Sequence, residues 1–193
     1  MTRIVAGTHR GRRVEVPSGT ATRPTADRAR EGMFSSLQSL VDLEGARFLD
    51  LYAGSGALGL EALSRGAAHA TLVESDERVL AVLRGNAERL GLPAEVVALP
   101  VERFLAGQPS PDDRPLDDRP PDDRPPYDVV VLDPPYELDA DPVLVTLLPW
   151  LAEDGVVVVE RRTKGAPPAW PEGLAGVRSR TYGEATLWYG SRS

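Results

Sequence analysis

Cysteine is absent from this chain of 193 residues, and lysine is reduced to Lys164. The first absence excludes disulfides, thiolate nucleophiles and cysteine metal sites, and it fits a reducing compartment. No apolar run approaches the roughly 20 residues that a transmembrane helix needs, and the first residues hold no apolar stretch typical of a signal peptide. These absences predict a cytoplasmic protein with no membrane partner and no metal, and the length suits one domain with a sizeable core.

Negative charge predominates, but it is unevenly distributed. The whole chain carries a net charge of -7. Residues 1–30 hold seven arginines and two acidic residues, a net charge of +5, which leaves -12 for the rest of the chain. A basic segment on an acidic body can direct a polyanion to one face while the other faces repel it. A solvated surface without a partner explains the charge equally well, so the motifs must decide between the two.

Alternating strand and helix patterns predict the fold. Thr25 is typical of the N-cap of a helix that reaches about Leu40. Ser75 is typical of the N-cap of a helix that reaches about Leu90, and Asp141 followed by Pro142 predicts another helix start. Further helical segments are predicted at 56–65 and 101–105, and strands at 3–6, 12–16, 46–52, 69–74, 94–99, 127–133, 155–160, 177–182 and 185–190.

This order of elements predicts an α/β fold, namely a doubly wound and mainly parallel sheet with helices on both faces and an antiparallel hairpin at the C-terminal end. One segment departs from the pattern. PDDRP-LDDRP-PDDRP repeats a five-residue unit three times at 111–125. Its aspartates, arginines and prolines favour neither a buried surface nor a sheet ladder. We expect an exposed insertion over 108–126, and we assign it no function.

A glycine-rich loop follows the first long strand. Gly54-x-Gly56-x-x-Gly59 stands between a predicted strand and a predicted helix, and Glu74 ends the next strand 20 residues beyond Gly54. Glycines allow close approach of the backbone to a ligand, and a carboxylate at Glu74 can accept both hydroxyls of a ribose. A strand–helix turn that needs small residues is the alternative. Asp50 favours S-adenosylmethionine over NAD, because a carboxylate there suits an ammonium group and repels a pyrophosphate.

The stretch YDVVVLDPPYEL ends a buried strand on an acid, two prolines and a tyrosine. The prolines end the strand because they cannot donate to a sheet ladder. Asp133 and the carbonyl of Pro134 are paired acceptors, Pro135 fixes the loop, and Tyr136 offers a flat face. Together they match a planar ring with an exocyclic amino group. The first and fourth strands of the doubly wound sheet are expected to be neighbours, so both loops open onto one crevice.

These two motifs resemble those of class I methyltransferases that use S-adenosylmethionine, in the amino-methylating branch marked by D/N-P-P-Y/F. Nearly the whole chain more closely resembles the bacterial 16S ribosomal RNA guanine-N2 methyltransferases, a family also called the guanine-966 enzymes. The segments that carry it are RIVAGTHRGRRVEVP, TRPTADRAREGMFSSL, LDLYAGSGALGLEALSRGA, VVLDPPY and YGEATLWY. The pattern RPT-x-DR-x-RE is the most specific to that family.

The resemblance implies a seven-stranded Rossmann-like sheet, S-adenosylmethionine as cofactor and methyl transfer to the N2 of a guanine in 16S rRNA, either free or in an assembling 30S particle. It implies a basic RNA-facing extension over 1–40, a methyltransferase domain over 41–193, and a monomer. The implied catalytic residues are Asp133, Pro134, Pro135 and Tyr136. The implied cofactor-binding residues are Asp50, Tyr52, Ala53, Gly54, Ser55, Gly56, Glu74, Ser75, Val101, Glu102 and Thr25. The RNA candidates are Arg3, Arg10, Arg12, Arg13, Arg23 and Arg28.

The sequence departs from the family after the third long strand, where many relatives have an acid that contacts adenine. Here the chain reads Leu99-Pro100-Val101-Glu102, so either Glu102 or the backbone of Val101 would take that role. Other activities stay open. The same chemistry would serve a DNA adenine-N6 or a protein glutamine methyltransferase, although DNA methyltransferases share the tetrapeptide without the basic arm. An RNA-binding module without catalysis and an NAD oxidoreductase are further alternatives.

Overall fold

The computed structural model describes residues 1–17, 24–107, 126–135 and 138–193. Seven strands form one sheet in the order β5-β4-β3-β6-β7-β9-β8. Neighbouring strands from β5 to β7 are parallel, whereas β9 is antiparallel to both β7 and β8. The strands are β3 (Arg47–Leu51), β4 (His69–Glu74), β5 (Ala94–Ala98), β6 (Tyr127–Leu132), β7 (Leu151–Arg162), β8 (Leu174–Tyr182) and β9 (Ala185–Arg192).

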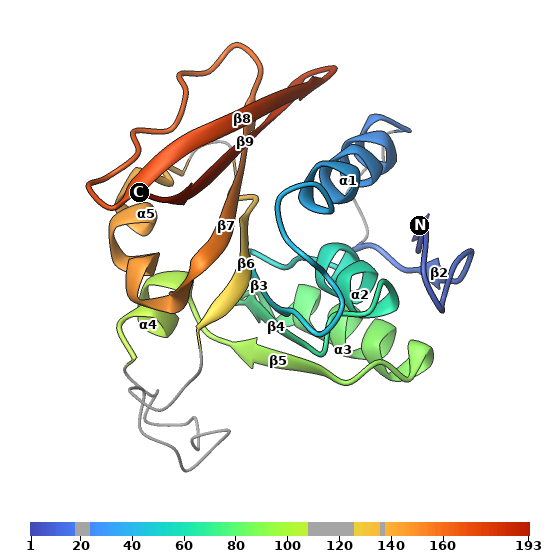
Figure 1. The fold of residues 1–193 in the computed structure, drawn as a ribbon. Coiled ribbons are helices and arrows are strands. Elements are labelled where there is room, and N and C mark those ends of the chain that lie inside the picture. Colours follow the sequence, from blue (N-terminus) through green and yellow to red (C-terminus); the bar gives the residue numbers. More distant parts are fainter. Residues whose placement is uncertain (18–23, 108–125, 136–137) are drawn as a thin grey trace.

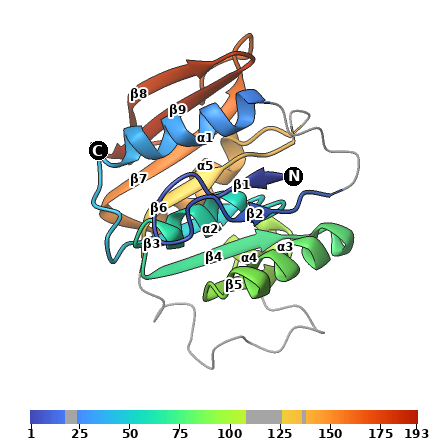
Figure 2. The same ribbon diagram turned by 90° about the vertical axis from the view of Figure 1, so that its right-hand side faces the viewer.

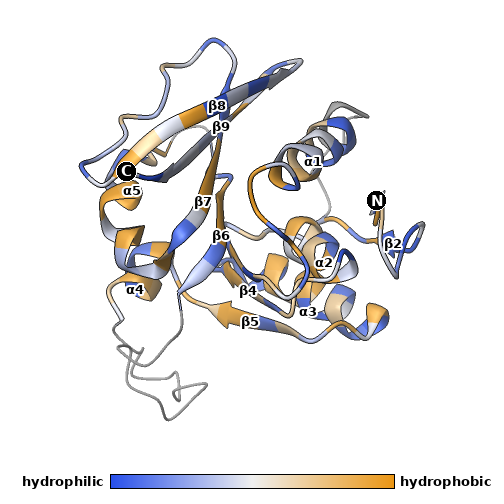
Figure 3. Ribbon diagram, viewed as in Figure 1, coloured by the Kyte–Doolittle hydropathy of each residue, from blue (hydrophilic) through white to orange (hydrophobic). Residues whose placement is uncertain are grey.

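Helices cover both faces of the sheet, as predicted. Side chains of α1, α2 and α3 pack in one hydrophobic cluster with one face, and those of α4 and α5 pack in a second cluster with the other (Figure 1). The helices are α1 (Pro24–Leu37), α2 (Ala57–Ser64), α3 (Glu77–Leu90), α4 (Val101–Leu105) and α5 (Asp141–Leu147), and α5 continues into a 3-10 turn (Leu148–Trp150). Figure 3 shows hydrophobic residues along the sheet strands and the helices beside them. The predicted doubly wound, seven-stranded fold is therefore confirmed.

A separate two-stranded hairpin precedes this sheet. It pairs β1 (Thr2–Arg3) with β2 (Arg13–Val14) in antiparallel register. The hairpin was expected from residues 3–6 and 12–16, and its strands are shorter than those patterns suggested. Among the described residues, no helix has the length and apolar character that crossing a membrane requires, and no group of three or more possible metal ligands is found.

Two predicted helix caps are wrong. The first helix begins at Pro24, so Thr25 lies inside it and does not precede it. The third begins after Asp76, whose side chain accepts hydrogen bonds from the backbone amides of Arg78 and Val79. The backbone amide of Ser75, one residue before this cap, donates to the carboxylate of Glu74 at 2.7 Å. The helix reaches Leu90, as predicted, and Gly91 follows it in the left-handed conformation.

Candidate active site

The two loops singled out by sequence lie at the same edge of the sheet. Strands β3 and β6 are adjacent and parallel, with Asp50 opposite Val131 and Leu51 opposite Leu132. Asp133, the next residue after β6, therefore lies beside the glycine loop that follows β3. Figure 2 shows β4 and the loop after β6 reaching the same side of the molecule, where α1 also begins. The predicted adjacency of the first and fourth strands is confirmed.

A pocket of about 390 Å³ opens at this edge. Its volume lies in the range of roughly 300–1,000 Å³ that is common for small-molecule sites. Seven of the residues predicted to bind cofactor or substrate contribute to its wall, namely Tyr52, Glu74, Ser75, Val101, Glu102, Asp133 and Pro135. Predicted residues of the same loops that do not line it are Asp50, Ala53, Gly54, Ser55, Gly56 and Pro134. One pocket thus joins the ends of β3, β4, β5 and β6.

Glu74 organises the cofactor side of the pocket. One carboxylate oxygen accepts the amides of Ser75 and Asp76 at 2.7 and 2.8 Å, and the other accepts the amide of Gly54 at 3.1 Å. A carboxylate has about four acceptor positions, so these three bonds leave capacity for an incoming hydroxyl. The side chain therefore fixes the glycine loop to the end of β4 and still presents an acceptor to the pocket.

The backbone between β3 and α2 is shaped for close approach. Gly54 has φ of 54° and a Cβ placed there would have only the carbonyl oxygen of Tyr52 within 4 Å, so the space before it is open. Tyr52 also has a positive φ, 77°, and among the described residues it is the only non-glycine residue that does. A non-glycine residue in this conformation costs about 1–3 kcal/mol, and such residues cluster at functional sites. Such strain is typical of turns at functional sites and agrees with the role predicted for this turn.

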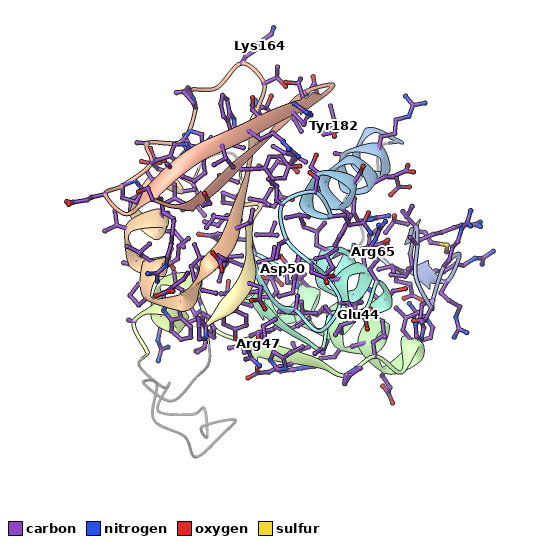
Figure 4. All side chains as sticks on the ribbon, in the orientation of Figure 1. Glu44, Arg47, Asp50, Arg65, Lys164 and Tyr182 are labelled. Carbon is purple, nitrogen blue, oxygen red and sulfur yellow. The ribbon has the colours of Figure 1, made fainter. Side chains whose placement is uncertain are left out.

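Asp50 is a buried carboxylate without an internal partner. It is 1% exposed, and neither of its oxygens has a hydrogen-bond partner. Burial first, and then the nearby carboxylates of Asp133 and Glu74, raise its pKa to about 7, while the Gly59 amide, whose geometry does not reach that of a hydrogen bond, acts in the opposite direction. Figure 4 shows Asp50 near the centre of the molecule, in contrast to the peripheral Lys164. A buried acceptor without a donor indicates a site that a cation or donor from a ligand completes.

Asp133 stands at the solvent-accessible side of the pocket. Solvent reaches the residue, but the surrounding protein still desolvates its carboxylate enough to raise the pKa to about 6. Pro134 beside it is buried, and Pro135 is exposed in the pocket wall. The Pro135 carbonyl accepts the amide of Leu138 at 2.8 Å and closes a turn. Tyr136 lies outside the described residues, so the predicted aromatic shelf stays a prediction.

A third acid, Glu160, was not assigned a role from the sequence. It lies near the end of β7 and is half-buried. Its pKa is raised to about 8, first by burial and then by the charge of Asp133. Its only signal in the sequence is an acid at the end of the apolar strand GVVVVE. The proximity to Asp133 depends on strand order, which the sequence pattern does not give directly.

The predicted RNA arginines lie on the surface. Arg3, Arg10, Arg12, Arg13 and Arg28 are exposed, and no ion pair joins any of them to an acid within the described ranges. Their charge is therefore available to a polyanion. Arg23 lies outside the described residues, as does nearly all of the insertion predicted at 108–126, and of Thr25 only the backbone is described.

Glu61 attaches the hairpin to the core, which the sequence did not reveal. This α2 residue is fully buried. Its carboxylate accepts the amides of Val5 and Ala6 at 2.7 and 2.9 Å and the guanidinium of Arg65 at 2.7 Å. Arg30, 7% exposed, donates to the Arg3 carbonyl at 2.7 Å from the same side. The hairpin, residues 2–14, is therefore seated on α2 through buried charge.

Asn86 makes a second connection, between the hairpin and the glycine loop. This α3 side chain is fully buried. Its Nδ2 donates to the carbonyls of Glu15 and Ser55 at 2.8 and 2.9 Å, and its Oδ1 accepts the amide of Glu15 at 2.9 Å. One amide side chain thus holds the chain after β2 against the loop before α2. The basic surface and the pocket share one rigid support.

Comparisons with known proteins agree with this geometry. The model of the family described as "Conserved hypothetical protein 95" matches residues 2–191. The chain is 36% identical over 186 residues to ribosomal RNA small subunit methyltransferase D of Escherichia coli (strain K12), covering 94% of this chain and 85% of that protein. It is 34% identical over 184 residues to the protein of that name from Haemophilus influenzae, covering 94% and 89%. A solved structure of a hypothetical protein from Thermus thermophilus superposes with a TM-score of 0.77 at 32% identity, covering 100% of both chains.

Proposed function

This chain belongs to the family described as Conserved hypothetical protein 95, and it is similar to ribosomal RNA small subunit methyltransferase D of Escherichia coli. From this premise we propose that it is an rRNA methyltransferase that uses S-adenosylmethionine. We infer that the methyl group goes to the exocyclic N2 of a guanine in 16S rRNA, at the position called 966 in the family. The observation that carries the proposal is the single pocket that joins Glu74 and Tyr52 to Asp133 and Pro135. In this pocket the loop proposed to bind a nucleoside lies beside the loop proposed to hold an amino group.

The residues fit S-adenosylmethionine in their chemistry. The unpartnered carboxylate of Asp50 suits the ammonium group of the methionine moiety, and the free acceptor capacity of Glu74 suits a ribose hydroxyl. The open space before Gly54 admits a ligand close to the backbone. Val101 and Glu102, both in the pocket wall, are the candidates for the adenine side. When bound, this cofactor supplies a methyl group on an electrophilic sulfonium.

The DPPY loop would position the target nitrogen. An exocyclic amino nitrogen on an aromatic ring is a weak nucleophile because its lone pair is delocalised. Asp133 and the carbonyl of Pro134 would accept its two N–H groups, which favours a pyramidal nitrogen and aligns its lone pair. Tyr136 would stack on the base once the base leaves its own stack. Pro135 fixes the turn that carries these groups.

The basic extension over residues 1–40 would hold the RNA, and residues 41–193 would form the catalytic domain. The exposed arginines of the hairpin and of α1 supply phosphate contacts, which orient RNA without reading its sequence. Because Glu61 and Asn86 seat the hairpin on the core, the bound phosphates would stand at a fixed distance from the pocket. The substrate is 16S rRNA, either free or in an assembling small subunit.

Replacing Asp133 tests the proposal. Asp133→Ala is expected to lower methyl transfer to small-subunit particles that lack the modification by at least about 100-fold, because it removes an acceptor that positions the nucleophile. Calorimetric binding of S-adenosylmethionine should be largely retained. The matched control Asp154→Ala, on an exposed residue of β7, should keep full activity. Full activity of Asp133→Ala, or a mapped product other than N2-methylguanine, would reject the assignment.

A further inference from the structure

We propose that Glu160 selects guanine as the target base, its carboxylate accepting the hydrogen bond of guanine N1–H while Asp133 holds the adjacent exocyclic amino group. The inference rests on the proposed function and deepens it, because the DPPY loop by itself does not distinguish guanine from the other bases that carry an amino group. It adds one residue to the site and gives that residue a specific chemical role.

Strand register places the two carboxylates side by side. Strands β6 and β7 are parallel neighbours, with Val131 opposite Val158 and Leu132 opposite Val159. The next position on each strand is Asp133 on one and Glu160 on the other. Side chains alternate between the two faces of a sheet along each strand. Asp133 and Glu160 come two residues after Val131 and Val158, so both acids are expected on the face that those valines share with α1, α2 and α3. The charge of Asp133 raises the pKa of Glu160, which agrees with this placement.

Among the described residues, no ion pair joins Glu160 to a basic residue. The next residue, Arg161, lies on the opposite face of the strand, where its guanidinium pairs with Asp141 at the start of α5 and lies 3.7 Å from Asp139. Burial, and then the charge of Asp133, raise the pKa of Glu160. Two like charges at neighbouring positions are costly unless donors from a ligand come between them.

Guanine is the base that offers those donors. Its Watson–Crick edge presents N1–H next to the exocyclic 2-amino group, so two adjacent donors face two adjacent acceptors. Adenine and cytosine carry an acceptor nitrogen beside their amino group, and an ionised Glu160 facing that nitrogen leaves both groups unpaired. Because the pKa of Glu160 is raised to about 8, this selection is expected, and is tested, at a pH above that value. One carboxylate after β6 therefore suits several amino bases, and the pair on β6 and β7 suits guanine.

The test uses a base analogue that lacks N1–H together with the 6-carbonyl oxygen of guanine. 2-Aminopurine keeps the 2-amino group, but its N1 is an acceptor. Small-subunit rRNA would be ligated to carry guanine or 2-aminopurine at the position that the wild-type protein methylates, and then assembled into particles. The wild-type protein is expected to prefer guanine by at least about 100-fold in kcat/KM, since sites built around a donor reject analogues that lack it.

Glu160→Gln should reduce that preference to about tenfold or less, because an amide N–H can donate to the N1 of 2-aminopurine. Glu153→Gln, on an exposed residue of the same strand, should keep the wild-type preference. Glu160→Asp keeps an acceptor and should keep the preference at a lower rate. This variant decides the matter if Glu160→Gln methylates neither base.

Three outcomes separate the two proposals. A wild-type protein that does not methylate guanine in these particles rejects the proposed function, and the inference with it. A wild-type protein that methylates both bases equally well rejects the inference alone. A Glu160→Gln variant with the full wild-type preference, or a Glu160→Asp variant without any preference, also rejects the inference and leaves the proposed function intact.

Discussion

Replacing the buried Asp50 by asparagine should stabilise the protein without its cofactor and weaken the binding of S-adenosylmethionine. Folding raises the pKa of this carboxyl from 3.8 to about 7. Between these values the folded protein keeps a proton that the unfolded chain releases, so the free energy of unfolding falls as the pH rises through the window. The difference corresponds to about 4 kcal/mol of destabilisation at a pH above 7.

The asparagine variant removes the charge but leaves a buried amide without a partner, which costs about 1–3 kcal/mol. The net gain in the free energy of unfolding at pH 8 is therefore about 1–3 kcal/mol, and at pH 5 the gain should disappear because Asp50 is mostly protonated there in the folded protein. Urea unfolding followed by tryptophan fluorescence at pH 5, 6, 7 and 8 measures the gain at pH 8 and its disappearance at pH 5. Asp154→Asn is the exposed control.

Cofactor binding should change in the opposite direction. Loss of a charge-assisted hydrogen bond to the ammonium group predicts a Kd about 10- to 100-fold higher in the variant, measured by calorimetry at pH 8. For the wild-type protein the affinity should rise with pH up to about 7, as Asp50 becomes ionised. A variant whose stability runs parallel to the wild-type curve from pH 5 to 8, together with unchanged affinity, would refute the reasoning.

Three further substitutions test the basic hairpin and its seat. Replacing Arg10, Arg12 and Arg13 by alanine should lower the slope of log binding constant for RNA against log salt by about 0.7–0.9 for each lost phosphate contact; an unchanged slope would move the RNA surface elsewhere. Glu61→Ala leaves buried donors without an acceptor and should lower the free energy of unfolding in urea by about 3 kcal/mol or more; a loss below about 1 kcal/mol would contradict the buried-charge account. Gly7→Ala would place a Cβ 1.7 Å from the Ser64 carbonyl oxygen, at the contact between the hairpin and α2. This variant should weaken RNA binding in a filter assay while cofactor affinity is kept. Full RNA affinity would show that the attachment of the hairpin to α2 is unimportant for RNA binding.

The doubly wound fold and the adjacency of the first and fourth strands followed from the sequence pattern, because apolar strands alternating with helices permit few topologies. The pattern also predicted that Asp133 lies beside the loop after Asp50, since parallel strands end at one edge. The prediction of Ser75 as a cap failed because the helix begins one residue later, where the carboxylate of Asp76 accepts the amides of Arg78 and Val79.

Polar residues that act through tertiary contacts could not be found this way. Glu61 stands inside LGLEAL and Asn86 inside LRGNAERL, where a polar side chain looks like part of a solvated helix face. Their partners are 31 to 71 residues away in sequence, in segments without regular structure. Glu160 was missed for a similar reason, since its significance comes from a neighbour on another strand. Periodicity identifies which face is buried, but it does not identify which buried acid meets which donor.

The buried seat of the hairpin has a consequence for dissecting the protein into parts. Residues 2–15 look like a detachable tail in the sequence, and a truncation that begins after them would be the usual way to ask what a tail does. Here that cut would leave Glu61 facing Arg65 without the two amides it accepts, and Asn86 without Glu15. The shortened chain would lose folding free energy and RNA affinity together. Point substitutions of the exposed arginines separate the two losses, and truncation does not.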